Sequence, residues 1–202
     1  MNRKRKILGL LLLPVAGVLV NAARAEYLRP RDAGAQEAKQ SQLAPLHLKA
    51  DLSEKILYVY EDGKLVKTYT FADGRAAHPT PRGTFKIDKV VWNPAWVPPD
   101  AKWAKGKTPK DPSNPDNPMK VVKIFFQEPD YYIHGTDDPD SIGSAASHGC
   151  LRMEPLEAAD LAIRVMEASG ARKDSSWYQN AIEKGETRTV RLPRKVEMVI
   201  TA

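Results

Sequence analysis

Apolar and polar residues alternate over much of the chain beyond residue 45. This alternation is clear over residues 46–50, and residues 55–60 are rich in β-branched and aromatic side chains. The β pattern resumes over residues 65–71, directly after the pair Asp62-Gly63 and one lysine. Period-two alternation predicts half-buried strands. An Asp-Gly pair between two of them predicts a hairpin with a type I′ turn, which needs positive φ at both turn positions.

Further strands continue the pattern towards the C-terminus. They are predicted over residues 84–91, 121–126 and 131–134, with two closing strands, residues 190–192 and 196–200, on either side of Pro193. The period becomes helical only between the third and fourth of these strands. The sequence therefore predicts a mainly β domain.

Residues 155–169 carry the strongest helical pattern. The polar residues that give this helix one solvent-facing side are Glu157, Asp160, Arg164 and Glu167. Pro155 suits the first turn of a helix, and Gly170 suits the position just past its end. A shorter C-terminal helix is predicted over residues 177–184, capped by Ser175 or Ser176 and ending at Gly185.

Residues 92–119 show neither alternation nor a helical period. They contain seven prolines and three tryptophans, Trp92, Trp96 and Trp103. Long loops without regular structure in compact domains are usually lids or binding loops, and tryptophan offers a large contact area. We therefore predict that Trp96 and Trp103 bind substrate. The alternative is that the tryptophans only pin the loop to the core.

The N-terminal segment is typical of an export signal. Residues 3–6 are basic, residues 7–20 are apolar, and Ala23-Arg24-Ala25 fits a signal-peptide cleavage site. The 14 apolar residues are few for a membrane-spanning helix, which needs about 20. We expect a signal peptide over residues 1–25, a flexible leader over residues 26–45 and one folded domain over residues 46–202. An uncleaved signal would be the only membrane attachment.

Loss of that signal changes the charge of the chain. The formal net charge is +6 at pH 7, but residues 1–25 hold five basic residues and no acidic one, so the rest carries +1. Proteins that bind nucleic acid need a surplus of positive charge. The sequence thus predicts no nucleic-acid partner.

The only cysteine of the 202 residues, Cys150, lies in the segment 147–153 (SHGCLRM). His148 is two positions before it, and a second histidine, His134, ends a predicted strand. A lone cysteine forms no internal disulfide, and a thiol with an ordinary pKa is mostly protonated at neutral pH. We expect the two histidines and the N-terminus of the following helix to lower this pKa and so activate the thiol as a nucleophile.

Zinc binding and inert burial are two alternatives for this cysteine. A structural zinc site needs four ligands, and the region offers two histidines and one cysteine, so we predict no metal. An inert core cysteine would have apolar neighbours, whereas Ser147 and Arg152 flank this one. The remaining histidines, His47 and His78, lie outside the motif and are expected to be solvated and uninvolved.

Several stretches resemble the L,D-transpeptidase (YkuD-type) catalytic domain. The segments similar to its active-site signature are residues 133–136 (IHGT), 141–143 (SIG) and 147–153 (SHGCLRM). Residues 80–85 (TPRGTF) resemble a turn of that family and residues 52–74 its opening hairpin, so the likeness covers about residues 46–201. Arg152 and the loop rich in proline and tryptophan are closer to Gram-negative periplasmic members.

The resemblance implies a β-sandwich-like catalytic domain that acts on peptidoglycan in the periplasm without metal or cofactor. Its donor would be a stem tetrapeptide, attacked at the carbonyl of the L-centre of its third-position diamino acid, with release of D-alanine. An amine then accepts the acyl group. That acceptor is a second stem peptide, which gives a 3→3 cross-link, or a wall-attached lipoprotein.

The resemblance also assigns roles to individual residues. Cys150 matches the nucleophile and His134 the general base, with its imidazole oriented by a backbone carbonyl at the position of Gly135. The N–H groups near Gly149 and Cys150 are expected to form the oxyanion hole, with His148 and Ser147 supporting it or positioning substrate. Arg152 is expected to meet a substrate carboxylate, the alternative being an ordinary surface salt bridge.

Two other activities remain open on the sequence. The same acyl-enzyme given to water would make the protein an L,D-carboxypeptidase, an amidase or an endopeptidase. A cell-wall-binding module without activity is the third reading, and the intact pair His134 and Cys150 argues against it.

Overall fold

The computed structural model describes residues 45–183 and 185–202. The predicted signal peptide, nearly all of the predicted leader, and Lys184 lie outside the described residues. The strands are β1 (Leu46–Asp51), β2 (Ile56–Glu61), β3 (Lys64–Thr70), β4 (Asp73–Gly74), β5 (Gly83–Trp92), β6 (Lys120–Gln127), β7 (Tyr131–Gly135), β8 (Ala145–Ser147), β9 (Leu151–Met153) and β10 (Arg188–Thr201). The α-helices are α2 (Pro155–Ser169) and α3 (Ser175–Glu183), and two short 3-10 helices are η1 (Lys102–Ala104) and η2 (Pro139–Ser141).

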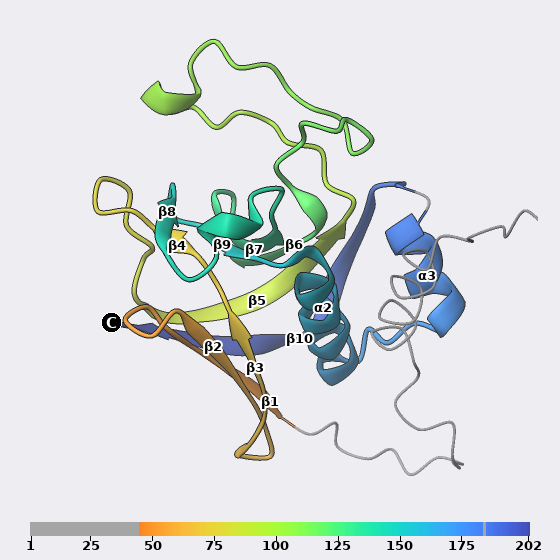
Figure 1. Ribbon diagram of the computed structural model, residues 1–202. Coiled ribbons are helices and arrows are strands. Elements are labelled where there is room, and N and C mark those ends of the chain that lie inside the picture. Colours follow the sequence, from red (N-terminus) through yellow and green to blue (C-terminus); the bar gives the residue numbers. More distant parts are fainter. Residues whose placement is uncertain (1–44, 184) are drawn as a thin grey trace, which may run out of the picture.

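Eight of these strands form one curled sheet in the order β3-β2-β1-β10-β5-β6-β7-β9, while β4 and β8 pair separately (Figure 1). The predicted mainly β class with two helices is confirmed. The predicted hairpin is confirmed too, since Asp62 (φ 51°) and Gly63 (φ 74°) both have positive φ and join Glu61 to its partner Lys64.

The hydrophobic core lies between the curled sheet and α2, which packs against β6, β7 and β10 (Figure 1). Trp92 is fully buried in it and meets Trp177 of α3 edge to face, with 6.1 Å between ring centroids. The prediction that Trp92 belongs to the proline-rich loop is wrong, because Trp92 ends β5 as a core residue. Its side chain therefore anchors the point where the loop of residues 93–119 leaves the sheet.

Helix α2 has the predicted bounds, with Gly170 in the left-handed conformation (φ 90°) just past its end. One residue of its predicted solvent-facing side is buried. Asp160 accepts hydrogen bonds from the Tyr69 hydroxyl and, at 3.2 Å, from Arg164 Nε. A polar period alone does not distinguish a solvated carboxylate from one paired inside the core.

The C-terminal strands and the cap of α3 also differ from the prediction. The closing strands are one strand, β10, with a register shift between Arg191 and Val196 that accommodates Pro193, which has no N–H to give to the ladder. Helix α3 is capped by the Asp174 carboxylate, which accepts from the N–H of Trp177 at 2.7 Å.

Strands β7 and β9 run parallel at one edge of the sheet, with His134 in register with Arg152. Strands β4, β8 and β9 were not predicted, because two or three residues are too few to show a period. Together they hold the segment around Cys150 in place, since the Ala72 backbone bonds Arg152 in both directions and Arg75 N–H donates to Ser147 O at 3.1 Å. Over the described part of the chain, no helix is long and apolar enough to cross a membrane.

Candidate active site

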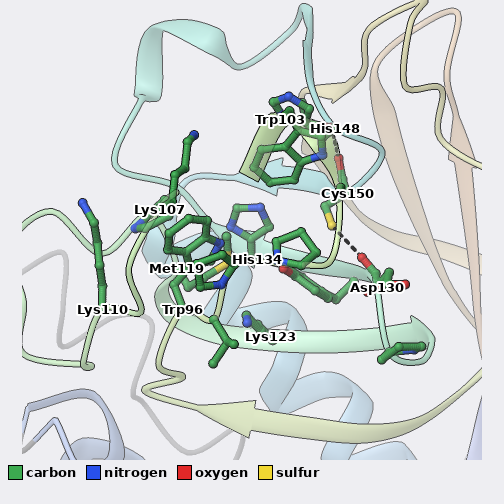
Figure 2. A pocket seen from close by; sticks show the side chains of 18 of the residues that line it. Trp96, Trp103, Lys107, Lys110, Met119, Lys123, Asp130, His134, His148 and Cys150 are labelled. Carbon is green, nitrogen blue, oxygen red and sulfur yellow. Dashed lines mark hydrogen bonds between the residues drawn. The ribbon is translucent and has the colours of Figure 1, made fainter. Parts of the chain in front are cut away.

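A cavity of about 1170 Å³ lies between the loop of residues 93–119 and the edge formed by β6, β7 and the turn before β9 (Figure 2). The predicted site residues among those that line it are Trp96, Trp103, His134, Ser147, His148, Cys150 and Arg152. Residues far apart in the sequence therefore meet in one place. Gly135 and Gly149 contribute backbone groups next to it.

Cys150 sits in the turn that leads into β9, and its thiol donates to the backbone carbonyl of Asp130 at 3.2 Å (Figure 2). Burial raises the pKa of the thiol to about 11, although the backbone N–H and the hydroxyl of Tyr132 donate to the sulfur and oppose this rise. The nearest positive charges that also oppose it belong to Lys123 and Arg152. The expected lowering of the thiol pKa was therefore wrong, because desolvation outweighs the donors. The thiol is protonated at neutral pH.

The helix that follows Cys150 gives the sulfur little help. Strand β9 separates the cysteine from α2, and the Glu154 carboxylate caps that helix by accepting the N–H of Leu156 at 3.0 Å. A carboxylate at this position offsets the partial positive charge of the helix N-terminus.

His134 lies on β7 and is only 3 % exposed. Its Nδ1–H donates to the carbonyl oxygen of Gly135 at 2.8 Å, so in the neutral ring Nε2 has the free lone pair. Burial lowers the pKa of His134 to about 3, the Gly135 carbonyl opposes this, and the charges of Arg152 and Lys123 add to the lowering. The imidazole is thus a neutral base of fixed tautomer. A Cβ on Gly135 would lie 2.5 Å from the carbonyl oxygen of Lys120, so only glycine fits there.

His148 is surrounded by other rings and by a guanidinium. Trp103 stacks on it with centroids 3.9 Å apart, His78 lies 4.8 Å away, and Arg75 Nη2 donates to His148 Nε2. Burial and then the charge of Arg75 lower the pKa of His148 to about 4. The neutral ring therefore carries its proton on Nδ1 and is a donor. His78, which the sequence predicted to be solvated and uninvolved, lines the cavity beside this ring.

Ser147 stabilises the turn through two hydrogen bonds of its hydroxyl. Its hydroxyl donates to the carbonyl oxygen of Cys150 at 2.6 Å and accepts the N–H of Gly149 at 3.0 Å. Gly149 has φ 111°, and a Cβ there would lie 2.7 Å from the ring of Tyr131. The Gly149 N–H that was predicted for the oxyanion hole is thus already bonded. Within the described chain, no hydrogen bond occupies the N–H of Cys150.

Arg152 forms the salt bridge that was the alternative prediction for it. Its guanidinium lies 3.4 Å from the Asp138 carboxylate, and it also lines the cavity. Ion pairs of this kind near the surface are weak.

The loop of residues 93–119 forms one wall of the cavity. Its base is closed by Trp96 and Lys110, whose backbones exchange two hydrogen bonds of 2.8 Å, and Trp96 itself is buried. Farther out, Trp103 covers His148, and the ammonium of Lys107 lies 5.2 Å from the Trp103 ring (Figure 2). Both predicted tryptophans thus face the cavity. Trp96 lies at the base of the loop, and Trp103 lies over the turn of residues 147–150, the catalytic turn.

Four further residues lie at the site and were not predicted for it from the sequence: Arg75, His78, Lys123 and Tyr132. Arg75 and His78 precede the turn of residues 80–85 and reach the site only through the pairing of β4 with β8. Lys123 lies inside a run, residues 121–126, that is otherwise apolar, and a lysine at such a position was the one available signal.

The described residues include no group of three or more His, Cys, Asp or Glu side chains suited to a metal ion. The chemistry that they do support is acyl transfer: a thiol as nucleophile, a neutral imidazole as base and N–H donors nearby. A mainly β domain with such a site has the groups that acyl transfer by a cysteine and a histidine requires.

Comparison with known proteins identifies the family to which the chain belongs. The sequence model of the L,D-transpeptidase catalytic domain (YkuD) matches residues 45–190. The chain belongs to this family.

Curated relatives and solved structures are similar to it. YkuD proteins of Bacillus licheniformis and Bacillus subtilis, both named as L,D-transpeptidases, are 34% and 30% identical to it over 118 residues. These alignments cover 58% of this chain and 59% of each relative, so the matched part spans less than two thirds of their length. An L,D-transpeptidase structure from Mycobacterium smegmatis aligns at 18% identity with a TM-score of 0.48, over 79% of this chain and 59% of that one.

Proposed function

We propose that this protein is an exported, cysteine-dependent L,D-transpeptidase that acts on peptidoglycan stem peptides in the periplasm. The observation that carries the proposal is the meeting of Cys150 with a neutral His134 in one cavity (Figure 2). The Gly135 carbonyl fixes the imidazole by accepting from its Nδ1–H. Membership of the family supports the same chemistry. The donor is a stem tetrapeptide whose third residue is a diamino acid.

Acylation starts from the protonated thiol. When the donor carbonyl approaches, Sγ passes its proton to Nε2 of His134 and attacks the carbonyl carbon at the L-centre. Tyr132 stabilises the sulfur through its N–H and hydroxyl as negative charge develops there. The bond to D-alanine then breaks, the proton on His134 goes to the leaving amine, and a thioester on Cys150 remains.

The oxyanion of the tetrahedral intermediate needs donors that are free in the resting protein. The N–H of Cys150 and Nδ1–H of His148 meet this condition, whereas the N–H of Gly149 is held by Ser147. A donor aimed at this charge contributes about 3 to 4 kcal/mol of transition-state stabilisation. The oxyanion hole is therefore assigned to Cys150 and His148.

In the second half of the reaction an amine attacks the thioester. His134 takes a proton from that amine, an amide bond forms, and the thiol is restored. Trp103 over the catalytic turn limits the access of water and so favours an amine over hydrolysis. Transfer to a second stem peptide, giving a 3→3 cross-link, is the reaction we propose.

The test uses residues 26–202 and defined tetrapeptide muropeptides, with products read by mass spectrometry. A cross-linked dimer that has lost one D-alanine is the expected product, and Cys150→Ala should give none. Free tripeptide without dimer would assign the protein to the hydrolytic L,D-carboxypeptidases instead. Products in the Cys150→Ala protein would refute the thiol mechanism altogether.

A further inference from the structure

Lys123 brings a positive charge into the floor of the catalytic cavity (Figure 2). It lies on β6, in register with His134 on β7, and it is 9 % exposed. Its ammonium lies 4.6 Å from the centroid of the Tyr132 ring and donates to the carbonyl of Ala95 at 3.4 Å. No ion pair found in the described part of the chain includes it. A buried lysine without a carboxylate is rare, because burial of an unpaired charge is costly.

The groups around this ammonium come from three other strands and the connections between strands. Cys150 faces it from the turn before β9, and Tyr132 and His134 face it from β7. Other charges near the site belong to Lys89 on β5, which is paired with Glu128, and to Arg152 on β9. Asp130, between β6 and β7, and Lys107, in the loop of residues 93–119, also line the cavity. The nearest anion that the reaction creates is the Cys150 thiolate.

Charge interaction links the two groups directly. The thiolate raises the pKa of Lys123 and the ammonium lowers that of Cys150, more strongly than Arg152 does. Burial is the larger effect and lowers the pKa of Lys123 to about 8. The side chain therefore stays charged at neutral pH and becomes neutral in mild alkali.

We propose that Lys123 is a positioning residue for acylation: its buried charge, behind the Tyr132 ring, stabilises the Cys150 thiolate as the thiol loses its proton. This inference rests on the proposed role of Cys150 as the nucleophile. It explains why the cavity carries an ammonium where a methionine would fill the same space and stabilise the fold. It also offsets part of the desolvation of the sulfur.

The experiment follows alkylation of the thiol by iodoacetamide from pH 6 to pH 10. Since Cys150 is the only cysteine in the 202 residues, every adduct reports on this sulfur. Lys123→Met should react about threefold more slowly at pH 7. One pKa unit of lost stabilisation lowers the thiolate fraction about tenfold, and the greater nucleophilicity of the remaining thiolate offsets part of that loss.

The shape of the pH profile separates a charge effect from a structural one. The alkylation rates of the wild-type protein and Lys123→Met should converge above pH 8, where Lys123 loses its proton. Lys123→Arg keeps its charge, so it should still react faster than Lys123→Met there. Lys120→Met is the matched control: Lys120 lies on the same strand, donates to the Pro115 carbonyl outside the cavity, and should leave the profile unchanged.

Lys123→Met is expected to melt at the same temperature as the wild type or higher, because it removes a buried charge. Equal alkylation rates for wild type and Lys123→Met at pH 7 would overturn the proposal. So would a defect confined to the KM for the tetrapeptide, which would assign the ammonium to a substrate carboxylate. The two proposals can fail separately. Activity of Cys150→Ala on muropeptides would refute the proposed function, whereas the alkylation rates of wild type and Lys123→Met require no turnover and would be unaffected by that result.

Discussion

Cys150 combines two properties that are rarely found together: it is the proposed nucleophile, and it rests as a thiol. Its reactivity must therefore arise when substrate binds and His134 takes the proton. Cys150→Ser should lower turnover by at least about a thousandfold, since a serine hydroxyl is a much poorer nucleophile at this site. Muropeptide turnover and a thermal melt check this. Near-normal activity in a folded serine variant would contradict the thiol mechanism.

Ser147 shows how a buried hydroxyl maintains the catalytic turn. Ser147→Ala removes the hydrogen bond to the Cys150 carbonyl and leaves the Gly149 N–H without its partner. We expect unfolding free energy to fall by about 1 to 3 kcal/mol and acylation to slow, because the turn that aims the thiol loosens. Denaturant unfolding and single-turnover acylation measure the two effects.

Ser144→Ala is the matched control for this prediction. Ser144 is exposed and donates to the Ser141 carbonyl at 2.6 Å, outside the turn. Its replacement should leave acylation unchanged. Equal losses in the two variants would mean that the hydrogen bonds of Ser147 have no special role.

Some residues of the site could be predicted from the sequence and others could not. Cys150, His134 and His148 lie in short motifs whose residue types already suggest the chemistry. The direction of the thiol pKa could not be predicted, because it depends on burial by segments distant in sequence. The same holds for His78 and Lys123, which reach the cavity through strand pairing.

At the scale of elements, the loop of residues 93–119 gives its two cavity tryptophans different positions. Trp103 covers His148, whereas Trp96 is buried where the loop closes on Lys110. Trp103→Ala should raise the ratio of hydrolysis to transfer with little change in melting temperature, because it opens the site to water. Product ratios by mass spectrometry and thermal melts give both quantities.

Trp96→Ala serves as the comparison within the same loop. Loss of a buried tryptophan costs about 3 to 5 kcal/mol in a core, so this variant should mainly lose stability. If Trp103→Ala left the product ratio unchanged and lowered the melting temperature as much, both tryptophans would be structural pins.

Elements with a clear period were predicted almost to their ends. Helix α2 and the β2–β3 hairpin are set by local patterns, namely a proline at the start, a glycine at the end and an Asp-Gly turn. The short strands β4, β8 and β9 have no such pattern. They exist because tertiary contacts bring their backbones together, and they are the elements that frame the catalytic turn.

The molecule as a whole should lose stability in acid because it buries His134 as a neutral ring. Its pKa falls from 6.5 to about 3 on folding, so between these values the unfolded chain binds more protons. The stability that this group contributes is present above pH 6.5 and is lost as the pH falls towards 3. The loss amounts to about 2 kcal/mol at pH 5.

Denaturant unfolding from pH 7.5 to pH 4 tests this dependence, with His134→Gln as the comparison. The variant should show a shallower decline of unfolding free energy with acid than the wild type. Parallel curves for the two proteins would show that His134 titrates alike in the folded and unfolded chains.

The order of the strands is a property that only the whole molecule reveals. The first strand, β1, pairs in parallel with the last, β10, in the middle of the sheet. No local pattern encodes a pairing between segments about 150 residues apart along the chain. Burial of alternate residues on both strands fixes it instead.

The protonated resting state of Cys150 also bears on the durability of the protein under oxidative stress. Peroxides attack the thiolate, so a sulfur that stays a thiol between turnovers is oxidised slowly. With no second cysteine in the sequence, a sulfenic acid formed there could not be trapped as an internal disulfide and would be open to further oxidation to irreversible acids. Desolvation of the sulfur thus works as chemical protection of a side chain that the molecule cannot repair by itself.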